Sequence, residues 1–199
     1  LNTNTQVIEI ASNDGYLLQF FKEKKIPVLG IEPSENTAAV AKQKGIESIV
    51  DFFGTRLALE LVSNGIKADL LLGNNVIAHV PEINDFVAGL KILLSEKGII
   101  TFEFPHLLQL IDKNQFDTIY HEHFSYFSFF NIKQIFEQHD LVMFDVQELP
   151  THGGSLRIFA KHADDVSNSI TKNVAEMLEK EIKYGINNLE IYQTYQVKA

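Results

Sequence analysis

The segment "YHEHFSYFSFF", Tyr120–Phe130, gathers the side chains best suited to proton chemistry. His121 and His123 flank Glu122, and imidazole is a suitable base because its pKa lies near neutral pH. A carboxylate beside a histidine can orient the ring and fix its tautomer. The segment could therefore be a metal site, a packed aromatic cluster or a catalytic site.

These three interpretations differ in what they explain. Two histidines and a glutamate within four residues rarely give good metal geometry, because paired histidines on a helix stand four residues apart. Aromatic packing explains the rings of residues 124–130 but not the histidines and the glutamate. We therefore favour catalysis and predict no metal ligand. In an extended segment Tyr120 and Glu122 would share one face, opposite His121 and His123, whereas a turn would break this alternation.

The composition limits the class of protein. The chain has 199 residues, 45% of them hydrophobic, which is enough for one domain with a sizeable core. A net charge of −9 without a basic run argues against nucleic acid and anionic membrane surfaces as partners. There is no cysteine and no apolar stretch long enough for a membrane helix. The chain opens without an initiator Met, so we expect a fragment cut from a longer protein.

Strand and helix patterns alternate along the chain with short links. We expect strands at 7–11, 27–33, 47–53, 68–75, 99–105, 141–149 and 154–161, and helices at 16–24, 37–44, 55–65, 83–98 and 131–140. Gly98 is the expected end of the fourth helix. The pattern predicts an α/β fold with a doubly wound, mostly parallel seven-stranded sheet and an antiparallel pair at one edge.

The pattern changes from Asp164 onward. Ile170, Val174, Leu178 and Ile182 recur every fourth residue, which predicts an amphipathic helix with little core of its own. We predict a ligand-binding domain at 1–163. Residues 164–199 would form a helical extension or the start of a further, truncated domain.

The first turn, "EIASNDG", points to the kind of ligand. Ligands of doubly wound folds bind at the carboxyl ends of the strands, and a dinucleotide site would need the pattern G-x-G-x-x-G. Here Glu9 and Asp14 frame a turn with the single glycine Gly15. Such acids would repel a pyrophosphate and suit a cationic ligand, so we predict S-adenosylmethionine as the cofactor.

Later strand ends add candidate contacts. Glu32 could accept both ribose hydroxyls, Asp51 could hold the adenine amino group, and Phe52 or Phe53 could pack on the ring. Glu32 could instead only cap its strand, the two Phe could be ordinary core, and Asn74 and Asn75 could serve a turn. His79 fits a helix-flanking or lid position better than a catalytic one. The predicted cofactor-binding residues are Glu9, Ala11, Ser12, Asn13, Asp14, Gly15, Glu32, Pro33, Asp51, Phe52, Phe53, Asn74, Asn75 and Val76.

Together, "VIEIASNDGYLL", "GIEPS", "GNNVIAHVPEINDF", "FEFPH", "YHEHFSYFS" and "THGGSLR" resemble the sugar C-methyltransferases. The resemblance covers roughly residues 7–161. It implies a class I methyltransferase Rossmann-like domain, the same cofactor, a nucleotide-linked keto-deoxysugar as substrate and a cytoplasmic location. Family members have a cysteine-rich zinc domain before this part and a Rossmann-like domain after it. Most of both would be missing here, so flanking domains of the same protein are expected partners.

C-methylation beside a ketone needs a base for the α-proton and a donor that stabilises the enolate oxygen. By the resemblance His123 is the base, assisted by Tyr120 and Glu122. His121, His152 and Gly153 are predicted to bind substrate, although "HGG" could equally be a bare hairpin turn. Arg157 could contact an anionic group or form a surface ion pair. An O- or N-methyltransferase and a non-catalytic cofactor-binding module remain alternatives.

Overall fold

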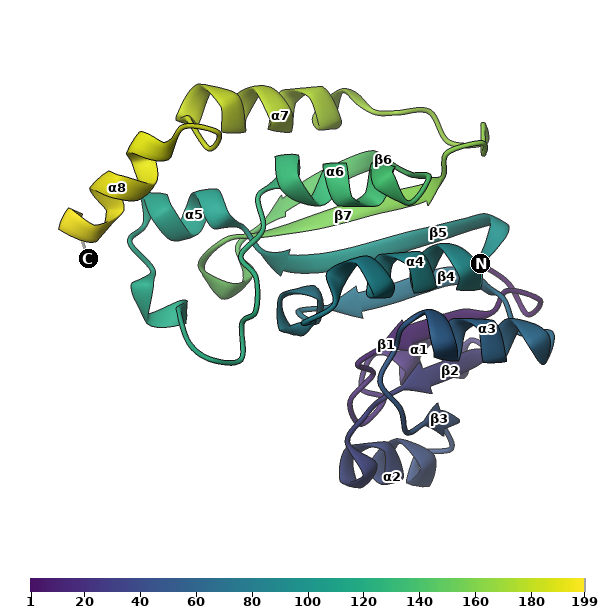
Figure 1. Ribbon diagram of the computed structural model, residues 1–199. Coiled ribbons are helices and arrows are strands. Elements are labelled where there is room, and N and C mark those ends of the chain that lie inside the picture. Colours follow the sequence, from purple (N-terminus) through teal and green to yellow (C-terminus); the bar gives the residue numbers. More distant parts are fainter. Residues whose placement is uncertain (199) are drawn as a thin grey trace.

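The computed structural model describes residues 1–198, and its centre is one seven-stranded sheet in the order β3-β2-β1-β4-β5-β7-β6 (Figure 1). The strands are β1 (Val7–Ile10), β2 (Val28–Ile31), β3 (Ser48–Ile49), β4 (Ala68–Asn74), β5 (Leu94–Pro105), β6 (Leu141–Leu149) and β7 (Ser155–His162). Strands β1 to β5 pair in parallel, and β7 lies antiparallel between β5 and β6. The predicted mostly parallel sheet with an antiparallel pair at one edge is confirmed.

Helices cover both faces of the sheet, as predicted for a doubly wound fold. They are α1 (Leu18–Glu23), α2 (Glu35–Gln43), α3 (Thr55–Ser63), α4 (Ile83–Leu93), α5 (Leu107–Asp112), α6 (Phe129–Gln138), α7 (Lys172–Tyr184) and α8 (Leu189–Lys198). Short 3-10 turns are η1 (Ile77–His79), η2 (Phe116–Thr118) and η3 (Thr151–Gly153). The main core joins α3, α4 and α6 to one face, and a smaller core joins α1 and α2 to the other.

The order of the strands reverses between β1 and β4. All four residues of β1 are buried, because helices cover the strand from both sides. From β1 the chain builds outward to β2 and β3, and then returns to β4 on the other side. This reversal opens a crevice beyond the carboxyl ends of the two strands, where open α/β sheets bind their ligands.

The largest differences from the predicted boundaries lie after β3 and between α4 and β5. Strand β3 has only two residues, so Asp51 and the following Phe residues lie in a loop. Helix α4 ends at Leu93, and Gly98 lies inside β5. Leu94 pairs with Ala68 at the start of β4, so sheet pairing ends the helix before the glycine. A Cβ atom on Gly98 would lie 2.7 Å from the Ala68 carbonyl oxygen, which explains the glycine by close backbone approach.

Helix α7 forms as predicted, but only the middle of the predicted stripe, Val174 and Leu178, packs on the core. Val174 and Met177 belong to the main core, whereas Ile170 and Ile182 are 59% and 60% exposed. The expected stripe is wrong at its ends. Ile170 precedes the helix, and because a helix turns every 3.6 residues the buried face continues through Met177 and Glu181 and not through Ile182. Figure 1 shows α7 lying along β6 and α6. The boundary at residue 163 stays a prediction. Among residues 1–198, no helix is long and apolar enough to cross a membrane.

Candidate active site

A cavity of about 430 Å³ lies at the carboxyl ends of the first four strands. Half of the predicted cofactor-binding residues line it, namely Ala11, Pro33, Asp51, Phe52, Phe53, Asn75 and Val76. Its other lining residues are Ile10, Ile31, His79, Val80, Pro81, Glu82, Asp85 and Phe86, which the sequence reasoning did not assign to the cofactor. The walls are apolar with acids at the rim, which suits a ligand that joins an aromatic base to a positive charge.

The first turn is held in an unusual backbone conformation. Ala11 and Asn13 have φ values of 56° and 52°, and Gly15 has 74°. Glu32 fixes this turn, because one carboxylate oxygen accepts from the Asn13 backbone N–H (3.0 Å) and the other from the Ser34 N–H (2.8 Å). The buried Glu32 therefore joins the end of β2 to the first turn. Strained backbone held this firmly is typical of ligand sites.

Glu9 is a buried acid of the crevice. It is 1% exposed, and among the described residues its Oε2 atom has no hydrogen-bond partner. Burial raises the pKa of Glu9 from 4.5 to about 8. Burial, followed by the nearby Glu9 carboxylate, also raises the pKa of Tyr16. A buried, unpaired acid fits a cationic group such as the ammonium of the predicted cofactor.

Other predicted contacts have partners within the protein. Asp14 pairs with Lys44 at 2.5 Å on the surface, and this contact lowers the pKa of Asp14. Asp51 pairs with Arg56 at 2.5 Å. Lys44 therefore neutralises the charge of Asp14, whereas Glu9 has no ion-pair partner among the described residues, and the expectation that both acids meet the ligand stays a prediction.

The two phenylalanines after Asp51 differ in their surroundings. Phe53 packs edge-on against Phe86 with ring centroids 5.4 Å apart, whereas Phe52 is 79% exposed at the cavity wall. Ser12 and Asn75 each place a buried side-chain oxygen without a partner near the crevice, in the part of the chain that the structure describes. Together with Glu9 Oε2, these two oxygens and Phe52 are groups near the crevice that a ligand could contact.

The segment of residues 120–126 is a turn and not an extended strand. The His123 backbone N–H donates to the Tyr120 carbonyl (3.1 Å), which breaks the two-residue alternation. The His123 Nδ1 atom lies 3.0 Å from the Thr118 carbonyl, an acceptor, so Nδ1 carries the proton. Nε2 is then the basic nitrogen, and the Tyr120 hydroxyl lies 3.3 Å from it. The turn thus presents an imidazole base beside a phenol.

His79 connects the cavity to this turn. It lines the cavity, and its ring centroid is 4.8 Å from that of His123. Its Nδ1 atom donates to the Glu122 carbonyl at 2.9 Å, and the neighbouring Ala78 carbonyl accepts from the Phe124 N–H at 2.9 Å. The signal that could have identified His79 is its position, five residues after β4 at the reversal of strand order.

The remaining residues of the turn have less defined roles. His121 and Glu122 are exposed. The predicted orienting role of the Glu122 carboxylate is wrong in this structure, because the Thr118 carbonyl occupies the hydrogen bond of His123 Nδ1. Phe127 and Phe129 are buried as expected, but Phe124 is 62% exposed and does not belong to the apolar packing.

The predicted substrate residues of the "HGG" link lie at the ends of β6 and β7. His152 and Gly153 have φ values of 50° and 77°, and the Gly153 carbonyl accepts from Lys113 Nζ at 2.6 Å. Arg157 donates to Glu103 at 2.6 Å, so the ion-pair alternative holds for Arg157. Whether this link contacts a substrate stays a prediction.

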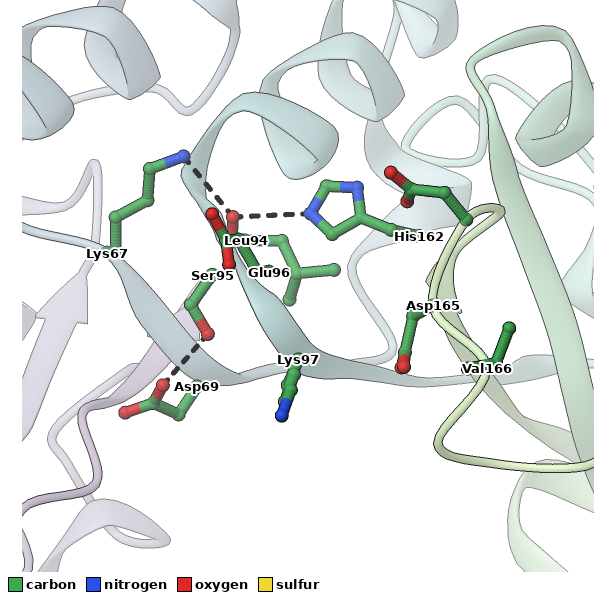
Figure 2. A pocket seen from close by; sticks show the side chains of 10 residues that line it. Lys67, Asp69, Leu94, Ser95, Glu96, Lys97, His162, Asp165 and Val166 are labelled. Atoms are coloured by element: carbon green, nitrogen blue, oxygen red, sulfur yellow. Dashed lines mark hydrogen bonds between the residues drawn. The ribbon is translucent and has the colours of Figure 1, made fainter.

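A larger open cavity of about 880 Å³ lies at the opposite ends of the parallel strands (Figure 2). There Lys67 and His162 both point at the Leu94 carbonyl, and Ser95 donates to Asp69 at 2.8 Å. The amino ends of β4 and β5 lie at this cavity, whereas cofactors of such sheets bind at the carboxyl ends of the strands. We therefore place the candidate active site in the smaller cavity.

Comparison with known proteins agrees with this geometry. The family described as "Methyltransferase domain" matches residues 1–146. The chain belongs to this methyltransferase family. A second family, described as "C-methyltransferase C-terminal domain", matches residues 150–199. The predicted enzyme class, a methyltransferase, is confirmed, and S-adenosylmethionine agrees with it as the cofactor.

Two relatives and one solved structure illustrate the similarity. The C-methyltransferase NovU of Streptomyces niveus is 37% identical over 95% of this chain, which spans 45% of that protein. The resemblance to C-methyltransferases is thereby confirmed. The ubiquinone biosynthesis O-methyltransferase of Bartonella quintana is 26% identical over 49% of this chain and 40% of its own length. The chain thus spans less than half the length of both curated relatives.

The solved structure is a SAM-dependent methyltransferase from Anabaena variabilis. It aligns with a TM-score of 0.65 at 16% identity, over 81% of this chain and 79% of its own. At this identity the likeness supports the fold, and it confirms the predicted class I methyltransferase architecture.

Proposed function

We propose that this chain is the cofactor-binding and catalytic core of a cytoplasmic C-methyltransferase that acts on a nucleotide-linked keto-deoxysugar. The cofactor would be S-adenosylmethionine, which supplies an electrophilic methyl group when bound. The flanking parts of the longer protein would complete the sugar-nucleotide site. The one observation that carries the proposal is the His123 ring, held as the Nδ1–H tautomer with its basic Nε2 beside the Tyr120 hydroxyl.

The cofactor residues follow from the crevice. The buried, unpaired Glu9 would face the positively charged end of the ligand. Glu32 would accept the ribose hydroxyls with the carboxylate that already holds the first turn. Phe53 and Val76 would pack on the adenine from the cavity wall. The acids at the rim would attract a cation and disfavour a phosphate-bearing cofactor.

The chemistry would start at His123 Nε2, which would take the proton from the carbon beside the ketone. Because such a carbon acid is much weaker than imidazolium, the enolate oxygen needs a hydrogen-bond donor. The Tyr120 hydroxyl, 3.3 Å from Nε2, would be that donor when a substrate lies between them. His79 would hold the turn at the cavity, because its Nδ1 atom bonds to the Glu122 carbonyl.

Proton exchange in deuterated buffer tests this proposal in the full-length protein. We expect His123→Ala to lower the rate of α-proton exchange in a keto-sugar nucleotide by roughly 100-fold or more, since general bases contribute this much. Nuclear magnetic resonance of the sugar measures the rate, and calorimetry with S-adenosylhomocysteine should show unchanged binding.

The matched control is His139→Ala, a half-buried histidine that is bonded to Asn84 and does not line the cavity. It should leave exchange unchanged. Normal turnover of the His123→Ala variant would contradict the proposal and favour O- or N-methylation, which needs no carbon base. Cofactor binding without transfer to any sugar nucleotide would favour a non-catalytic module.

A further inference from the structure

A buried pair of ionisable side chains joins helix α7 to the residue that follows β5. His106 Nε2 lies 2.6 Å from Glu181 Oε1, and the side chains are 0% and 1% exposed. Burying a carboxylate and an imidazole is costly unless both are well bonded, and one apolar pair of similar size would stabilise the fold as well or better. The pair therefore calls for an explanation beyond stability.

Glu181 has two further donors. Its Oε1 atom accepts from the Phe129 N–H at 2.6 Å, and its Oε2 atom accepts from the Phe130 N–H at 2.8 Å. These N–H groups open helix α6, where they have no partner within the helix and where a negative charge is favourable. Ser128 completes the cap by accepting from the Asn131 N–H at 3.1 Å. One carboxylate thus holds His106 and the start of α6 together.

The segment that Glu181 holds is the exit of the turn that carries His123. Phe127 pairs with His106 in an isolated β-bridge, and its carbonyl accepts from the Leu107 N–H at 3.0 Å. On its other side the turn is tied to Ala78, which accepts from the Phe124 N–H. The turn therefore has one anchor on η1, at the cofactor cavity, and a second on the buried His106–Glu181 pair.

Resting on the proposed function, we propose that Glu181 is a positioning residue for methyl transfer, which together with His106 fixes the exit of the His123 turn. Glu181 lies in the part of the chain that matches the C-methyltransferase C-terminal domain, whereas the turn lies in the methyltransferase-domain match. The C-terminal segment would thus support the catalytic base through a contact in the protein interior. A displacement of the base by about 1 Å can cost roughly 100-fold in rate, so such support has a measurable effect.

The test uses Glu181→Gln in the full-length protein. Its amide keeps the shape of the side chain but turns one acceptor into a donor that faces a backbone N–H. We expect α-proton exchange in a keto-sugar nucleotide to fall by about 10- to 100-fold. Binding of S-adenosylhomocysteine should stay unchanged, because the cavity lies on the other side of the turn. The ¹⁵N signals of the His123 ring should lose the pure Nδ1–H tautomer, a change that a purely structural role would not produce.

The matched control is Glu179→Gln on the exposed face of the same helix, which should leave exchange and ring signals unchanged. Should Glu181→Gln not fold, Glu181→Asp keeps the charge but cannot reach all three donors, and it should show the same loss of exchange. Suppose that His123→Ala lowers exchange as expected. Normal exchange and an unchanged His123 tautomer in the folded Glu181 variant would then overturn the inference. Normal exchange in His123→Ala would instead overturn the proposed function itself.

Discussion

Glu9 lies near the end of β1 and Glu32 directly after the adjacent β2, yet their carboxylates differ in what they bind. Both are buried, but Glu32 is bonded to two backbone N–H groups, whereas Glu9 keeps an oxygen without a partner among the described residues. A buried acid without a partner favours its neutral form. At the residue scale, Glu9 is therefore the acid whose charge state depends on whether a cation is present.

The pKa of Glu9 gives a pH prediction. It is raised from 4.5 to about 8 in the folded protein. The folded protein therefore keeps a proton that the unfolded chain loses between these values. The contribution of Glu9 to the free energy of unfolding is fully present below the lower value and is lost as pH rises through the upper one. The slope is at most about 1.4 kcal/mol per pH unit.

Urea unfolding of the wild type and Glu9→Gln between these pH values measures the effect. The difference in unfolding free energy between the two proteins should change with pH, because glutamine does not titrate. A constant difference across the range would mean that Glu9 titrates normally in the folded protein. Adding saturating S-adenosylmethionine should weaken the pH dependence, because a bound cation favours the charged carboxylate.

At the element scale, helix α7 is part of the main core despite its charged sequence. Val174 and Met177 pack into the core shared with β6 and α6, and Glu181 is buried beneath the helix. Ile182, at the border of this buried face, is 60% exposed. The helix therefore packs against the edge strand β6 through a face that contains Val174, Met177 and Glu181. The predicted stripe shares only Val174 with these buried residues.

Paired truncations on α7 check this packing. We expect Met177→Ala to lower the free energy of unfolding by about 2–4 kcal/mol, since a buried side chain is removed and a cavity is left. Ile182→Ala, at an exposed position of the same helix, should change it by about 0.5 kcal/mol or less. Chemical denaturation of both variants gives these values. Equal effects at the two positions would show that α7 packs differently in solution.

At the scale of the whole molecule, two cavities lie at opposite ends of the parallel strands of one sheet. The larger opens at the amino ends of β4 and β5, and the smaller lies at the reversal of strand order. Size alone would choose the first. The direction of the parallel strands and the unpaired polar atoms near the crevice choose the second.

Blocking each cavity separates these choices. Val76→Trp would fill the smaller cavity, and Val166→Trp would add the same side chain beside the larger one, where Val166 is 93% exposed. S-adenosylhomocysteine at 100 times its Kd should stabilise the wild type by about 2.7 kcal/mol, seen as a rise in Tm. We expect the rise to persist in Val166→Trp and to disappear in Val76→Trp. The reverse pattern would place the cofactor at the amino ends of the strands.

The sequence by itself determined the fold class and the methyltransferase class, and it predicted about half of the residues around the candidate cofactor cavity. These follow from local signals: apolar runs alternate with amphipathic helices, and a first turn with acids and one glycine follows a buried strand. Ala11, Pro33 and Asn75 were predicted as cofactor contacts because each follows a strand end, and strand ends meet at one edge of a parallel sheet.

Only the tertiary structure decided how individual side chains are paired. Lys44 neutralises Asp14 from a distance of 30 positions, the Thr118 carbonyl replaces Glu122 at the His123 ring, and Glu181 reaches His106 across 75 positions. The contacts of Asp14 and Glu181 depend on where packing brings distant residues together. The Thr118 contact joins residues five positions apart and depends on how the turn folds, so none of the three follows from residue types and spacing alone. The energy of a buried polar group depends on its partner. The contacts of His79 with the Glu122 carbonyl and of Glu181 with the start of α6 are also long-range.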